Sequence, residues 1–214
     1  MSQPTNPYDN PEYRPQGMSG TKKLLLGLGI GCGVVLLICC GGFGALTYWG
    51  ANLAKNANLT DPAGIRRVTD EIVTISIPPG FEPNRAMDFV VPFGQGTKKI
   101  ALYRDTASSG WLKLDQSSGE AATNPGLATM DDTFDAELHR EPLTVTKSED
   151  FDTKVNGEQA EFVIEQGTRG EGGEEFWHVA GPFHGKGGPA HLEFEVKRSA
   201  FPQDQVLDLL KSMK

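Results

Sequence analysis

Apolar and polar residues alternate along most of the second half of this chain. This period of two predicts β-strands, because successive side chains of a strand point to opposite faces. "EIVTISI" is one example, in which Val73, Ile75 and Ile77 alternate before Pro78-Pro79-Gly80 stops the strand. The pattern predicts further strands at 98–105, 110–116, 143–149, 150–155, 158–167, 176–184 and 189–197.

Three other segments have the spacing of amphipathic helices. The first begins with Thr60 or Asp61 as the helix cap, followed by Pro62 at the first helical position. The second covers 128–140, and the third ends the chain after Pro202. Asn156-Gly157 is the preferred centre of a tight hairpin. Strands joined by tight turns pair antiparallel, so we expect an α+β domain in which helices flank an antiparallel sheet.

The first 50 residues have a different pattern. Residues 24–49 carry no charge, and a helix of this length exceeds the hydrocarbon thickness of about 30 Å. We therefore expect a transmembrane helix, because the apolar region of a cleaved signal peptide is shorter. Lys22 and Lys23 precede it, which favours a cytoplasmic N-terminus and an extracytoplasmic domain. Gly27 and Gly31 have the spacing that allows weak self-association of membrane helices.

These patterns divide the chain into four parts. We expect a disordered Pro-rich tail at 1–21, a transmembrane helix at 22–50, a linker at 51–59 and a globular domain at 60–214. The lipid bilayer is then the partner of residues 24–49, and the protein is a single-pass signal-anchor protein of the cell membrane.

Charge and cysteine content exclude some functions. The chain has a net charge of −8, and nothing in it forms a basic stripe, which argues against nucleic-acid binding. All three cysteines, Cys32, Cys39 and Cys40, lie in the apolar segment. The domain therefore has neither a disulfide nor a cysteine-ligated metal.

The domain resembles the PsbP-like group, which includes a photosystem extrinsic subunit and a nuclear-import factor. The resemblance rests on "VTISIPPGFEP", "TKVNGEQAEF" and the terminal "VLDLLKSMK". It implies an α/β/α sandwich and a non-enzymatic binding role. With the Pro-rich tail and Gly-rich anchor, the chain also resembles uncharacterised single-pass bacterial membrane proteins.

The stretch 174–196 holds three of the four histidines and is the candidate for chemistry. A hairpin that turns at Lys186-Gly187 would place Trp177, Val179, Phe183, Ala190, Leu192, Phe194 and Val196 on one face. The other face, expected to meet solvent, would hold Phe176, His178, His184, His191, Glu193, Glu195 and Lys197.

Two functions remain open at this stage, and a third interpretation keeps the domain in the cytoplasm as an anchored interaction partner. The first is a membrane-anchored extracytoplasmic binding or assembly module with a protein partner, without catalytic residues, metal or cofactor. The alternative is a metal-dependent hydrolase that uses His184 and His191 with a carboxylate such as Glu193. His178 and His191 are too far apart in the expected register to share a metal, and "GPFHGKG" lacks the spacing of a phosphate loop.

Overall fold

A computed structural model describes residues 57–91, 96–107, 109–123, 134, 138, 142–170 and 173–214. All of them belong to one compact unit, 52–214. The tail, the segment 24–49, Gly27 and Gly31 lie outside the described residues, as does the expected helix 128–140 apart from Phe134 and Leu138. No helix among the described residues is long and apolar enough to cross a membrane.

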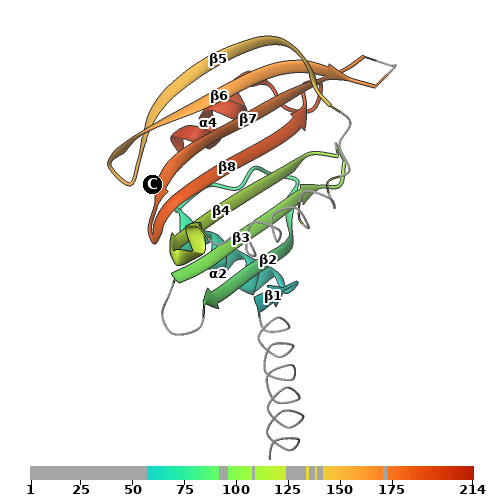
Figure 1. Ribbon diagram of the computed structural model, residues 1–214. Helices are drawn as coiled ribbons and strands as arrows, with labels where there is room; N and C mark the ends of the chain where they lie inside the picture. Colours follow the sequence, from blue (N-terminus) through green and yellow to red (C-terminus); the bar gives the residue numbers. More distant parts are fainter. Residues whose placement is uncertain are drawn as a thin grey trace, which may run out of the picture. The chain divides into compact units, whose positions relative to one another are not determined.

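Eight antiparallel strands form one sheet in the described residues (Figure 1). Their order across the sheet is β1-β2-β3-β4-β8-β7-β6-β5, so two four-stranded meanders meet where β4 pairs with β8. The strands are β1 (Asn58–Leu59), β2 (Phe81–Val91), β3 (Gly96–Asp105), β4 (Trp111–Gly119), β5 (Thr144–Val155), β6 (Glu158–Arg169), β7 (Glu174–Gly185) and β8 (Gly188–Lys197).

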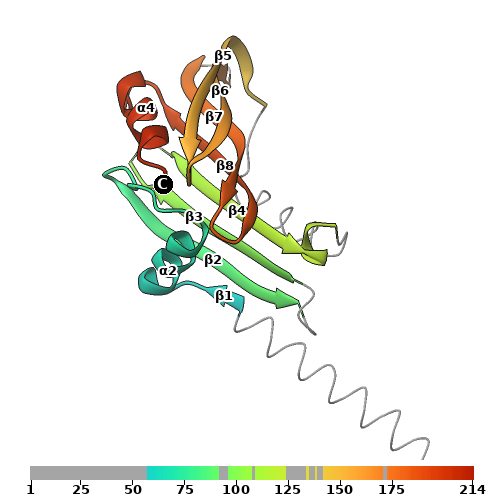
Figure 2. The same ribbon diagram turned by 90° about the vertical axis from the view of Figure 1, so that its left-hand side faces the viewer.

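Helices α2 (Pro62–Ile72) and α4 (Gln203–Lys211) cover one face of this sheet, here called the inner face (Figure 2). The Asp61 side chain accepts a hydrogen bond from the Gly64 amide at 2.6 Å, and Pro62 follows it, which confirms the predicted helix start. A short 3-10 helix, η2 (Glu120–Ala122), follows β4. The face turned away from α2 and α4 is called the outer face.

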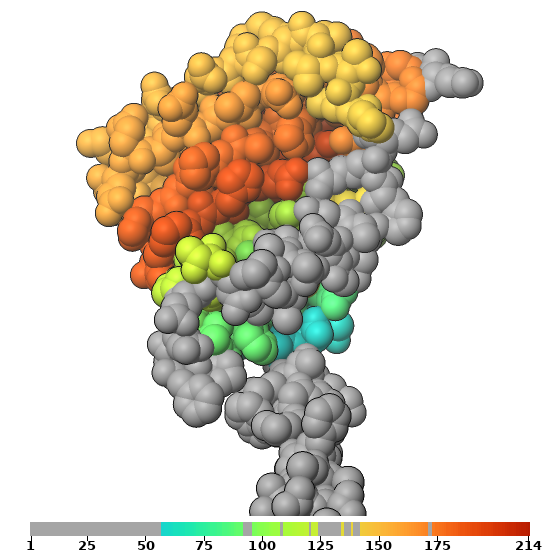
Figure 3. Space-filling view, viewed as in Figure 1, coloured from blue at the N-terminus to red at the C-terminus, as the bar shows by residue number. Residues whose placement is uncertain are grey.

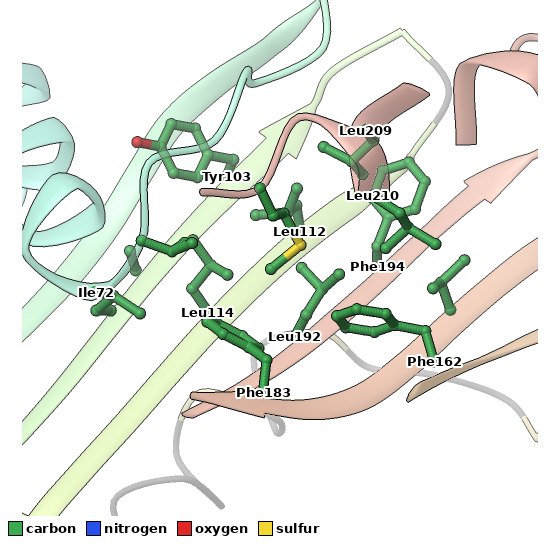
Figure 4. Close-up of a cluster of buried hydrophobic side chains, with 14 of the residues drawn as sticks. Ile72, Tyr103, Leu112, Leu114, Phe162, Phe183, Leu192, Phe194, Leu209 and Leu210 are labelled. Atoms are coloured by element: carbon green, nitrogen blue, oxygen red, sulfur yellow. The ribbon is translucent and has the colours of Figure 1, made fainter. Parts of the chain in front are cut away.

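The core lies between the inner face and the two helices. The cluster includes Leu114, Phe183, Leu192 and Phe194 of the sheet and Leu210 of α4, and Figure 4 shows Phe194 beside Leu210. A smaller cluster on the outer face joins Met87, Ile100, Leu102 and Trp111 to Phe134. The long strands therefore bury apolar side chains on both faces at β2 to β4.

The predicted fold class is wrong. The described residues form a sheet-dominated domain with two helices, rather than an α/β/α sandwich. The predicted strand at 71–77 is one source of the error, because α2 continues to Ile72 and residues 73–78 then run extended without joining the sheet. Thr74 instead pairs with Lys214, through N–O contacts of 2.9 and 2.8 Å between their backbones.

Two strand assignments also change. The segment that follows this connection, 81–91, forms β2, whose apolar alternation is hidden by a register shift between Pro83 and Arg85. The two strands expected at 143–149 and 150–155 are one strand, β5. Asn58 and Leu59, expected in the linker, pair with β2 as β1.

Candidate functional site

The β7–β8 hairpin has the register that the sequence predicted. Phe183 pairs with Ala190, Gly181 with Leu192, Val179 with Phe194 and Trp177 with Val196. The side chains expected on the apolar face all lie on the inner face of the sheet and are buried in the main core. The alternation of apolar residues therefore specified both the pairing and the buried side of this hairpin.

The opposite face is less exposed than predicted. His184 and His191 are exposed, whereas Phe176 and Glu195 are 7% and 2% exposed. Arg169 of β6 contributes to this burial, because its guanidinium binds both carboxylate oxygens of Glu195 at 2.6 Å and lies 5.6 Å from the centre of the Phe176 ring. The expectation of a uniformly solvated face is wrong for these two residues.

The histidines of the hairpin face different partners. His184 Nδ1 lies 3.5 Å from Glu158 Oε2, and His191 pairs across the sheet with Asp115. Glu193 contacts His178 and Lys113. No group of three or more His, Cys, Asp or Glu side chains in the described part of the chain has an arrangement that could hold a metal ion.

His178 is the centre of a charged row on the outer face. Its Nδ1 lies 3.1 Å from Glu165 Oε2 of β6, and its Nε2 lies 3.4 Å from Glu193 Oε1 of β8. Lys113 Nζ of β4 approaches the other oxygen of Glu193 at 3.4 Å. The row therefore links four neighbouring strands, β6, β7, β8 and β4. Figure 3 shows the molecule from the outer face of the sheet.

The two carboxylates decide the charge of His178. Burial lowers the pKa of His178, but the hydrogen bonds that its ring donates to Glu193 and Glu165, and the negative charges of Glu193 and Glu195, outweigh burial, so the net pKa is raised. Both ring nitrogens then donate hydrogen bonds when the imidazole is protonated. His191 differs, because partial desolvation and the charge of Lys113 lower its pKa.

We expect protonated His178 to stabilise the fold. Because its pKa is raised in the folded state, this stability is fully present below its ordinary pKa of 6.5 and is lost as pH rises through the higher folded pKa. Urea unfolding at a series of pH values should show this loss in the natural protein and not in a His178→Gln variant. Both proteins keep His191, whose pKa is lowered mainly by desolvation. Parallel pH profiles would contradict the prediction.

The glycine-rich turn after β7 docks against the end of α2. The Lys186 amide donates a hydrogen bond to Ile72 O at 2.8 Å, and Lys186 Nζ donates to Asp70 O at 2.7 Å and to Thr74 Oγ1 at 2.8 Å. A cation on the last carbonyls of a helix is favourable. Lys186, the lysine of "GPFHGKG", therefore caps α2.

Packing also explains the glycines of this turn. A Cβ atom at Gly185 would lie 2.3 Å from Gln116 Nε2 and 2.9 Å from Ile72 O. A Cβ atom at Gly187 would lie 2.7 Å from Gln116 Oε1. The turn is thus glycine-rich because the buried Gln116 and the end of α2 approach its backbone closely.

A cavity not expected from the sequence patterns lies on the inner side of the domain. It has a volume of about 310 Å³ and lies between α2, the connection 73–80 and the first residues of β2. Ile75, Ile77, Phe81 and Pro83 line it with apolar atoms, and its polar lining comes from Tyr103, Thr69, Arg66 and Asp70. In Figure 4 the Tyr103 oxygen points away from the apolar cluster.

The hydroxyl groups of Thr69 and Tyr103 meet at this cavity. Thr69 Oγ1 lies 3.1 Å from Ile65 O, to which it can donate, and 2.8 Å from the Tyr103 hydroxyl oxygen. Either hydroxyl can be the donor between the two, and in both cases the Tyr103 oxygen keeps a lone pair that can accept from a donor in the cavity. Burial raises the pKa of Tyr103, so this hydroxyl stays neutral.

Two opposite charges at the cavity are one helical turn apart. Arg66 and Asp70 are exposed on α2 at positions i and i+4, yet their side chains form no ion pair or hydrogen bond within the described structure. The next arginine differs, because Arg67 contacts Glu71 at 2.7 Å and Asp88 at 3.1 Å. Arg66 and Asp70 therefore retain unused bonding capacity beside the open Tyr103 oxygen.

One sequence signal could have pointed to this cavity. Thr69 is a polar residue on the buried stripe of α2, alongside Ile65, Val68 and Ile72. A buried hydroxyl on such a stripe requires a polar partner. Nothing local identifies Tyr103 as that partner, because the two residues are 34 positions apart.

No family model, curated protein or solved structure matches the chain. The resemblance to PsbP-like domains therefore stays a prediction, and the α/β/α sandwich that it implied is wrong.

Proposed function

We propose that this protein is a membrane-anchored, non-catalytic binding module with an extracytoplasmic domain. The observation that carries the proposal is the α2 cavity, in which apolar walls surround polar groups whose hydrogen-bonding capacity is only partly used inside the domain. Small-molecule sites commonly combine apolar walls with a few polar groups that fix orientation. Residues 24–49 supply the anchor in this proposal.

The polar groups of the β7–β8 hairpin, which were first considered for chemistry, have structural roles instead. Lys186 caps a helix, and His178 is held between two carboxylates from neighbouring strands. These contacts stabilise the fold around the cavity. The proposed site therefore lies at α2, the connection 73–80 and the first residues of β2, on the other side of the sheet from His178.

Binding is tested with the full-length protein in detergent, by measuring its melting temperature against a chemically varied panel of small molecules. We expect at least one class of compound to raise the melting temperature. Ile77→Trp should abolish this rise by filling the cavity, whereas Val90→Trp, at a 58% exposed position of β2, should leave it intact. If no compound has an effect that depends on Ile77, the binding proposal is wrong.

The anchor and its orientation are tested separately. In right-side-out membrane vesicles, added protease should digest the domain, because Lys22 and Lys23 favour a cytoplasmic N-terminus. Vesicles opened with detergent provide the control for complete cleavage. Protection of the domain in sealed vesicles would place it in the cytoplasm, and release of the protein by alkaline washing would show that it is not membrane-anchored.

A further inference from the structure

We propose that the α2 cavity binds a small zwitterion of the size of a free amino acid, with an apolar side chain that ends in an N–H or O–H donor. This inference rests on the proposed function and names its ligand class. It follows from three features of the cavity: the charges at its rim, the hydrogen-bonding character of its floor, and its size.

The rim of the cavity favours a ligand that carries two opposite charges. Arg66 and Asp70 are placed where an arginine and an aspartate on a helix can attract each other, yet they do not form an ion pair. A ligand carboxylate bound to Arg66 and a ligand ammonium bound to Asp70 would satisfy both groups. A ligand with a single charge would leave one of them without a partner.

The floor favours a donor. Thr69 and Tyr103 share one hydrogen bond between their hydroxyls, and either can be its donor. The Tyr103 oxygen keeps an acceptor lone pair in both cases, so a hydroxyl or amine of the ligand can always donate to it. A ligand carbonyl or carboxylate would find a donor there in only one of the two cases.

The walls and the volume set the size of the ligand. Ile75, Ile77 and Phe81 contribute apolar surface between the rim and the floor, where an aromatic or aliphatic group fits. The volume of about 310 Å³ is at the lower end of ligand sites. A separate cavity of about 190 Å³ lies on the other side of Ile77, next to α4, so the site does not extend in that direction.

L-tyrosine is a suitable probe, because three analogues each lack one of the required groups. L-phenylalanine lacks the terminal donor, tyramine lacks the carboxylate, and 3-(4-hydroxyphenyl)propionate lacks the ammonium group. Calorimetry on the full-length protein in detergent should show binding of L-tyrosine. Each analogue should bind about tenfold more weakly or worse, the effect of losing one hydrogen bond to a charged or buried group.

Variants assign each interaction to a residue. Arg66→Ala should weaken L-tyrosine binding about tenfold and leave tyramine binding unchanged, because tyramine has no carboxylate for Arg66. Arg67→Ala is the matched control on the same helix and should change neither affinity. Tyr103→Phe should remove the preference for L-tyrosine over L-phenylalanine.

The outcomes separate this inference from the proposed function. If L-tyrosine does not bind, or binds equally to the Arg66→Ala variant, the zwitterion assignment is wrong. If another class of compound still binds in a manner that Ile77→Trp abolishes, the proposed binding function stands with a different ligand. If neither occurs, both proposals fail. Circular dichroism spectra of each variant should match those of the natural protein, so that loss of binding is not loss of fold.

Discussion

Replacing Trp177 with alanine should lower the free energy of unfolding by about 3–5 kcal/mol, the usual cost of removing a buried aromatic side chain. Trp177 is 6% exposed and belongs to the main core cluster. Its Nε1 donates a hydrogen bond to Phe201 O at 3.0 Å, and the Arg198 guanidinium lies 4.7 Å from its ring centre. The variant therefore loses apolar burial, a buried hydrogen bond and a cation–π contact together.

Urea unfolding followed by far-ultraviolet circular dichroism measures this loss without relying on tryptophan fluorescence. His184→Ala provides the control on the same strand, because the His184 side chain is 51% exposed. We expect that variant to stay within about 0.5 kcal/mol of the natural protein. A cost below about 1 kcal/mol for Trp177→Ala would mean that Trp177 does not contribute to the core as its burial indicates.

Leu210→Ala should cost about 2–5 kcal/mol of stability. Leu210 is fully buried on α4 and packs into the same cluster as Phe194 of β8. Removal of its side chain would leave a cavity between the helix and the sheet.

Leu207 is a matched control on the same helix. It is only partly buried against the cluster, so Leu207→Ala should cost less than half as much as Leu210→Ala. Urea midpoints of both variants give the comparison. Equal losses would show that α4 is not held through the face that contains Leu210.

The β7–β8 hairpin shows which parts of a fold local sequence can determine. Alternation along each strand specified which side chains face the core, and only one parity buries both apolar sets together. Asn156-Gly157 likewise identified the β5–β6 turn, where the φ angles of 51° and 82° suit these residue types. These features were predictable because neighbouring residues cause them.

The same alternation gave the wrong result at 73–77. Val73, Ile75 and Ile77 lie in an extended connection along the inner face, and the backbone of Thr74 pairs with the C-terminal Lys214 instead of a strand. Extended backbone with alternating apolar residues is compatible with either arrangement. The choice depends on residues near the other end of the chain, which a local pattern does not contain.

The sequence by itself determined the strands β3, β4, β6, β7 and β8, the start of α2 and the inward face of the last hairpin, because each depends on periodicity or on a cap within a few residues. The tertiary structure alone decided what the polar residues do. Lys186 caps a helix that ends 114 positions earlier, at Ile72, and Tyr103 meets Thr69 across 34 positions. Such contacts form when the chain folds back on itself, and no local propensity encodes which distant partner a buried polar group receives.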